Sequence, residues 1–192
     1  MANVAKFDRD EVLAKATWLF WSQGFQATST RDIQQAVNMR PGSMYAAFGG
    51  KADLYRLALE NYAGAMTRLL DQHLEDADTI PQGIRAFVTR VLLDTNCDEV
   101  ADVCLLYRTV AELGEDQAEL LACAREHLQR MEMRLVELVE EAKARNELPP
   151  EQDSKATAAE LQSAILGMRA YLRINGNRTI VQKMIDGLLP ES

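Results

Sequence analysis

Apolar residues between positions 121 and 142 recur at alternating steps of three and four, and this spacing limits the fold more than any other feature of the sequence. An α-helix places residues at such steps along one face, which other helices must cover. Elsewhere, Val, Ile and Thr do not gather into the alternating runs, bounded by turn residues, that mark strands. The sequence therefore predicts an all-α fold. The residues of the periodic face are Leu121, Ala124, Leu128, Met131, Leu135, Leu138 and Ala142.

Capping residues and helix breakers divide the chain into about nine helices. Ser29 and Asp32 have the spacing of a capping box, and Asn38 tolerates the left-handed conformation that ends a helix. A polar loop is expected at 94–102 and a linker at 146–153. The expected helices occupy residues 8–23, 29–38, 40–48, 51–76, 79–93, 103–113 and 121–142, and two more follow the linker.

The charge of the chain is divided unevenly between two expected domains. Residues 1–51 hold six basic and four acidic side chains, a net charge of +2, whereas the whole chain carries −8, which leaves −10 for residues 52–192. A basic head on an acidic body is compatible with nucleic-acid binding by the head alone. We therefore expect a three-helix N-terminal head at 1–51 and a C-terminal helical bundle at 52–192.

The two short helices of the head, joined by a tight turn, form a predicted helix-turn-helix. The second of them would enter a DNA major groove with its N-terminal residues, where Arg40 meets a guanine edge or a phosphate. Gly42 would let the backbone come close, and Ser43 and Tyr45 offer hydroxyl groups. Thr30, Arg31 and Lys51 would hold the flanking phosphates.

Two runs in the head resemble a known signature: LFWSQGFQATSTRDI at 19–33 and GSMYAAFGGKADLY at 42–55. Together they are similar to the N-terminal signature of TetR-family, or tetracycline-repressor-like, bacterial regulators. Ala46 and Ala47 depart from it, since members often carry an aromatic residue and a His there. Met39-Arg40-Pro41 also departs, because a small residue followed by Lys is common. The resemblance implies DNA contacts at Thr30, Arg31, Arg40, Pro41, Gly42, Ser43, Tyr45 and Lys51.

The resemblance also implies a homodimer formed by the last two helices. Small residues at Ala158, Ala164 and Gly167 would permit close approach of helices. The alternative is that these apolar faces pack only within one chain. The expected interface residues are Leu161, Ile165, Met168, Leu172, Val181, Met184, Ile185 and Leu188.

A small-molecule effector is expected to bind inside the body. Each candidate residue has ordinary core packing as its alternative, and Arg108 has two readings: it contacts an anionic effector, or it pairs with a carboxylate of the body. The candidates are Tyr62, Met66, Phe87, Val91, Cys104, Tyr107 and Arg108.

The three cysteines favour neither a disulfide framework nor a metal site, because they are odd in number and form no CxxC pair. Cys104 lies near the start of a short helix, where the pKa of a thiol can fall. A thiol-based electrophile or oxidant sensor is therefore an alternative to a reversible ligand sensor. No cofactor and no metal are expected.

Other classes of protein fit the sequence less well. Two His residues and no Gly-rich phosphate loop argue against an enzyme. A secretory signal and a membrane-spanning apolar stretch are not expected, which predicts a cytoplasmic protein. The preferred function is a sequence-specific repressor that an effector releases from double-stranded operator DNA. A helical protein-interaction module without DNA binding is the rival from another class.

Overall fold

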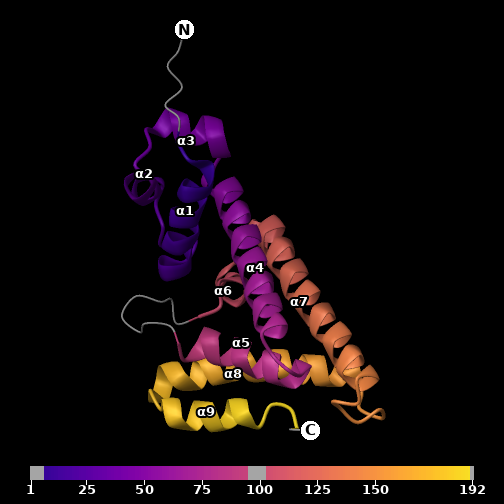
Figure 1. The fold of residues 1–192 in the computed structure, drawn as a ribbon. Coiled ribbons are helices and arrows are strands. Elements are labelled where there is room, and N and C mark those ends of the chain that lie inside the picture. Colours follow the sequence, from indigo (N-terminus) through magenta and orange to yellow (C-terminus); the bar gives the residue numbers. More distant parts are fainter. Residues whose placement is uncertain (1–6, 95–102, 191–192) are drawn as a thin grey trace. The chain divides into compact units, whose positions relative to one another are not determined.

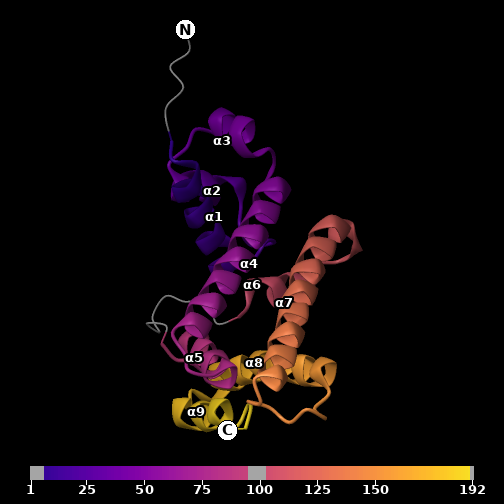
Figure 2. The ribbon, with the colours of Figure 1, turned by 45° about the vertical axis from the view of Figure 1, so that its right-hand side comes forward.

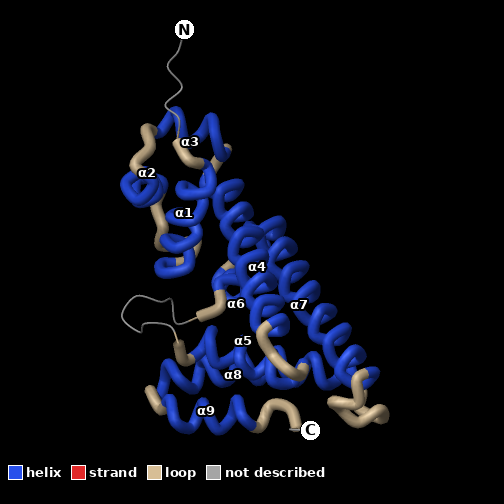
Figure 3. Tube along the Cα trace, viewed as in Figure 1, coloured by secondary structure: helices blue, strands red, loops and turns tan. Residues whose placement is uncertain are grey.

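A computed structural model describes residues 7–94 and 103–190, and every regular element within these ranges is helical (Figures 1 and 3), as predicted. Residues 95–102, which include most of the expected polar loop and Cys97, lie outside the described residues. The short 3₁₀ helix η1 has no counterpart among the predictions. The elements are α1 (Arg9–Gln23), α2 (Thr30–Val37), α3 (Pro41–Phe48), α4 (Lys51–Glu75), α5 (Ile80–Leu92), α6 (Leu105–Glu112), η1 (Glu115–Gln117), α7 (Ala118–Ala144), α8 (Ser154–Asn175) and α9 (Arg178–Asp186).

The helix ends of the N-terminal region follow the capping residues. Asp8 accepts hydrogen bonds from the backbone N–H groups of the first turn of α1. Ser29 and Asp32 form the predicted capping box: the backbone N–H of Asp32 donates to Ser29 Oγ at 3.2 Å, and that of Ser29 donates to Asp32 Oδ2 at 2.8 Å. Asn38 ends α2 with φ of 52°, in the left-handed region. These local signals therefore fix the start of α2 and the turn into α3.

The described chain packs as two compact units. The first unit holds the residues up to Gly64 and those from Cys104 to Glu126, so α6 packs with the N-terminal helices. The second holds the residues from Ala65 to Val103 and those after Glu126. The helices α4 and α7 each contribute to both units. The first unit carries the helix-turn-helix, and the candidate site is therefore built mainly from it.

The core of the second unit is a continuous apolar cluster from α5, α7, α8 and α9 and the end of α4. Within this unit α8 and α9 lie beside α5 (Figure 2). The periodic face of α7 contributes Leu135, Leu138 and Ala142, which are at most 2% exposed. The structure thereby confirms that this face is bundle core.

The capping box of α2 makes a testable prediction. Replacing Ser29 with Ala leaves the backbone N–H of Asp32 at the start of α2 without its acceptor, so the free energy of unfolding should fall by about 1 kcal/mol. Ser43→Ala is the matched control, because Ser43 is exposed and lies after the start of α3. Urea denaturation followed by circular dichroism measures both. Equal stability of the two variants would contradict a capping role for Ser29.

Candidate nucleic-acid interface

The helix α3 divides into a buried face and an exposed face. Met44 and Phe48 are 1% and 4% exposed and anchor the helix in the core of the first unit. Tyr45 is 48% exposed, so its ring faces out. The other predicted contact residues of this helix, Arg40, Pro41, Gly42 and Ser43, are exposed as well. The N-terminal part of α3 therefore presents the predicted DNA contacts to solvent.

The start of α3 suits a negatively charged partner. Arg40 is its N-cap residue and Pro41 occupies its first turn, and no side chain caps the helix. The first turn holds no acidic residue. Backbone N–H groups at a helix N-terminus, with the positive end of the helix dipole, favour phosphate oxygens. A cation and an uncapped helix end are therefore combined at one point on the surface.

Gly42 has no packing reason to be glycine. A Cβ atom built on it would meet no other atom of the chain within 4 Å. Its φ is not in the left-handed region that favours glycine. The absence of a side chain instead leaves space at the outer surface of α3, which would let DNA approach the helix backbone closely.

The flanking residues Thr30, Arg31 and Lys51 lie at the starts of α2 and α4. Arg31 is exposed, whereas Thr30 and Lys51 are half-buried. Lys51 Nζ lies 4.2 Å from the centre of the Phe25 ring, a cation–π contact that restrains the ammonium group. Partial burial lowers the pKa of Lys51 below its ordinary value.

Arg9 is a basic residue of this region that sequence reasoning missed. Its Nη1 donates to the backbone carbonyl of Ala47 at 2.9 Å, and its guanidinium carbon lies 4.7 Å from the centre of the Phe48 ring. Arg9 therefore joins the start of α1 to the end of α3. The place of Arg9 beside the N-cap residue Asp8 does not indicate this contact with α3, because only the folded structure brings position 9 close to position 47.

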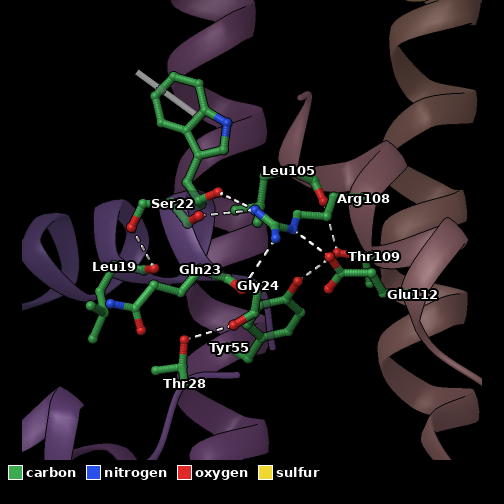
Figure 4. Close-up of polar contacts among 11 residues, drawn as sticks. Leu19, Ser22, Gln23, Gly24, Thr28, Tyr55, Leu105, Arg108, Thr109 and Glu112 are labelled. Carbon is green, nitrogen blue, oxygen red and sulfur yellow. Dashed lines mark hydrogen bonds and ion pairs between the residues drawn. The ribbon is translucent and has the colours of Figure 1, made fainter. Parts of the chain in front are cut away.

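Aromatic packing supports the helix-turn-helix from behind. The Tyr55 ring packs edge-on against Phe20 at 4.8 Å between ring centres and against Phe25 at 4.9 Å. Its hydroxyl is 2.8 Å from Thr109 Oγ1 on α6 (Figure 4). Burial raises the pKa of Tyr55 to about 12, although the hydrogen bond to Thr109 works against this rise. The phenol is therefore neutral at physiological pH and serves as a link between α4 and α6.

Arg108 does not stand free for an effector. Its guanidinium group donates to the carbonyls of Trp21, Ser22 and Gln23 at 3.0 to 3.2 Å and pairs with Glu112 at 2.5 Å (Figure 4). Of the two readings of Arg108, the structure bears out the pairing with a carboxylate. Four of the five N–H groups of the guanidinium are engaged in these contacts, and contact of Arg108 with an anionic effector stays a prediction.

The other effector candidates are divided between the two units. Tyr62, Cys104 and Tyr107 belong to the first unit, and Met66, Phe87 and Val91 to the second. Tyr107 is 46% exposed, whereas Tyr62 and Phe87 are buried and Met66, Val91 and Cys104 are half-buried. Their contact with an effector stays a prediction.

The expected interface residues of α8 and α9 also divide into two groups. Leu161, Met168, Val181 and Ile185 are at most 4% exposed within a single chain. These four therefore already pack within one chain, and their contact with a partner stays a prediction. The residues that remain near the surface are Ile165, Leu172, Met184 and Leu188.

Among the residues that the structure describes, no group of three or more His, Cys, Asp and Glu side chains is arranged to hold a metal ion. No helix in the same ranges is long and apolar enough to cross a membrane.

The geometry defines a helix-turn-helix protein, and comparison with known proteins identifies its family. Residues 12–58 match the family described as bacterial regulatory proteins, tetR family, and residues 80–188 match the tetracyclin repressor-like C-terminal domain. The second match alone covers more than half of the 192 residues. The chain belongs to the TetR family of bacterial regulatory proteins.

Individual relatives agree with this assignment. The chain is 26% identical over 171 residues to the HTH-type transcriptional repressor ComR of Escherichia coli strain K12, covering 87% of this chain and 80% of that protein. A TetR-family regulator from Cytophaga hutchinsonii has the same fold, with a TM-score of 0.82 at 20% identity over 94% of this chain and 90% of that one. So does a cysteine mutant of the TetR-family regulator CifR, complexed with 26-base-pair operator DNA, with a TM-score of 0.82 at 24% identity over 96% and 98% of the two chains.

The exposed glycine of α3 makes a prediction that separates stability from binding. Gly42→Ala should leave the free energy of unfolding unchanged or raise it, since the new methyl group meets nothing in the chain. Affinity for operator DNA should fall by about tenfold, the size of one lost base-pair match. Ala46→Ser adds one atom to an exposed position of the same helix, where no DNA contact is expected, and should keep the affinity. Fluorescence anisotropy measures both, and full operator affinity in Gly42→Ala would contradict the close approach.

Proposed function

We propose that the protein is a homodimeric transcriptional repressor that binds double-stranded operator DNA by sequence and leaves it when a small molecule binds. The exposed face at the start of α3 carries this proposal. It combines Arg40, an uncapped helix N-terminus and an unhindered glycine at position 42 over a buried apolar anchor. The relatives point in the same direction, because ComR is a transcriptional repressor and CifR binds operator DNA.

Dimerisation follows from the size of the DNA-reading surface. One helix-turn-helix contacts a short half-site, and dimers gain specificity by placing two recognition helices one DNA turn apart. The surface of α8 and α9 carries apolar side chains that one chain leaves uncovered: Ile174 is 80% exposed, Met184 41% and Ile180 37%. Gly167 adds an open position on α8, with room for a neighbouring helix. We propose that a second copy covers this surface.

Effector binding is proposed for the second unit, where buried polar atoms lack partners. His73 Nε2, Gln162 Oε1 and Arg169 Nε are buried and have no hydrogen-bond partner. Such atoms are costly unless a water or ligand satisfies them. A polar effector that satisfied one or more of these atoms would lower the free energy of the conformation that accepts it and shift the chain away from the DNA-binding state.

The alternatives make different demands on the chain. A thiol sensor would lose its response in Cys104→Ser, whereas a reversible ligand sensor would keep it. A protein-interaction module would bind no DNA at any sequence. The proposed function includes no enzymatic step, and it places the protein in the cytoplasm because its operator DNA is there.

Salt-dependent binding tests the proposed function. Wild-type protein should shift promoter DNA from beside its own gene, and the double variant Arg40→Ala, Tyr45→Ala should abolish the shift while remaining dimeric. Arg40→Ala alone distinguishes two kinds of contact: loss of a phosphate contact reduces the salt slope by about one for each of the two copies in the dimer, and loss of a guanine contact relaxes sequence preference. A double variant that bound as tightly as wild type would refute the assignment of α3.

The proposed dimer surface makes its own prediction. Met184→Glu should weaken dimerisation by at least about tenfold, because a carboxylate would have to be buried in the interface. Met133→Glu is the matched control: Met133, on α7, is 64% exposed and lies outside the expected interface. Sedimentation equilibrium measures both dissociation constants. Equal dimer stability in the two variants would place the interface elsewhere.

A further inference from the structure

We propose that Arg108 of α6 is a positioning residue for operator binding: it closes the C-terminal end of α1 and thereby fixes the helix that supports α3. The inference rests on the proposed function, because its consequence is a change in operator affinity. It assigns to a residue far along the chain a role that neither the helix-turn-helix motif nor the family match indicates. All the contacts that carry it lie within the first unit.

The last turn of α1 has carbonyl groups that the helix cannot satisfy by itself. Arg108 Nη1 donates to the carbonyls of Trp21 at 3.0 Å and Ser22 at 3.1 Å, and its Nη2 donates to that of Gln23 at 3.2 Å. The next carbonyl, of Gly24, accepts from Thr28 Oγ1 at 2.6 Å. Four consecutive carbonyls are thus paired, three of them by one side chain from another helix.

Electrostatics favours a cation at this end of α1. The C-terminus of a helix carries a partial negative charge, which basic residues of the last turn commonly offset. The last turn of α1 contains no basic residue. Arg108 supplies the missing charge from α6, and its side chain is only 22% exposed, so water weakens the contacts less than it would at an open surface. Glu112, one turn along α6, balances the guanidinium charge at 2.5 Å.

Gly24 is shaped to fit this cap. Its φ of +83° is in the region that favours glycine. A Cβ atom at this position would lie 2.5 Å from Glu112 Oε2 and 2.9 Å from Arg108 Nε, closer than nonbonded atoms approach. The backbone turn at Gly24 and the ion pair of α6 therefore occupy adjoining space, and a side chain at position 24 would have to displace this ion pair (Figure 4).

The two ends of α1 are held in the same way. At its N-terminal end, Arg9 donates to the carbonyl of Ala47 near the end of α3. At its C-terminal end, Arg108 of α6 donates hydrogen bonds to the last carbonyls of α1. The helix α1 thus connects α6 to the recognition helix, with an arginine–carbonyl contact at each end. Loss of the grip at Arg108 would free the C-terminal end of α1 and allow α3 to leave its binding position.

The test compares Arg108→Gln with Arg56→Gln in the full-length protein. Arg56 also pairs with a glutamate four residues on, Glu60 at 2.6 Å, in the same unit, and this ion pair lies along a single helix, α4. Arg108→Gln should lower operator affinity by about tenfold, the size of an ordinary coupling between distant sites. Arg56→Gln should leave it unchanged. The probe is the operator fragment that wild-type protein shifts.

Two readouts separate positioning from DNA contact and from general damage. The salt dependence of binding should keep its wild-type slope in Arg108→Gln, because no phosphate contact is lost. Hydrogen exchange of the amides in the last turn of α1 should become faster while that of α8 stays unchanged. A reduced salt slope, or unchanged exchange in α1, would overturn the proposal.

A conservative variant decides the outcome if Arg108→Gln fails to fold. Arg108→Lys keeps the charge but loses the planar guanidinium group that reaches several carbonyls. Its operator affinity should therefore lie below that of wild type, by less than tenfold. Wild-type affinity in a folded Arg108→Lys or Arg108→Gln protein would refute the role. If wild-type protein itself bound no operator, the proposed function would fail, whereas the exchange measurement on α1 would still test the cap.

Discussion

The packing of Tyr55 is the interaction on which the first unit depends. Its ring lies against Phe20 of α1 and against Phe25 in the turn after α1, and its hydroxyl is bonded to Thr109 of α6. This fully buried side chain thereby connects α4, which carries it, to α1 and to α6. Phe25 in turn carries the ammonium group of Lys51 over its ring. The arrangement that presents α3 to DNA begins with this cluster, because the short helices α2 and α3 bury too little surface to hold themselves in place.

An acidic chain can bind DNA because its charge is distributed by region. The net charge is −8, yet residues 1–51 carry a surplus of basic side chains. The arginine side chains also differ in what they contact. Arg40 and Arg31 are exposed, whereas Arg9 and Arg108 donate to backbone carbonyls inside the first unit. A count of charges therefore indicates a candidate binding region, but only the hydrogen bonds separate the arginines proposed to contact DNA from those that hold helices of the protein together.

Local features of the sequence predicted much of the fold. The capping box at Ser29 and the left-handed Asn38 depend on neighbours within a few residues, and the structure confirms both. Roles that depend on distant neighbours escaped prediction. Arg108 contacts carbonyls more than eighty positions away, so the residues around it in the sequence do not indicate that it caps α1. Val181 and Ile185 had the spacing of an apolar face, which does not tell whether the face packs within one chain or between two.

Two copies of the chain are proposed to read DNA through the start of α3. The most direct measurement is to incubate the purified full-length protein with a random pool of duplex DNA, recover the bound fragments and sequence them. The account predicts enrichment of a two-fold symmetric sequence whose half-sites are centred about one helical turn, or about 34 Å, apart. Arg40→Ala should either change the bases that are preferred in each half-site or weaken binding to all sequences equally. Recovery of fragments without a shared sequence, or of a single unpaired half-site, would contradict it.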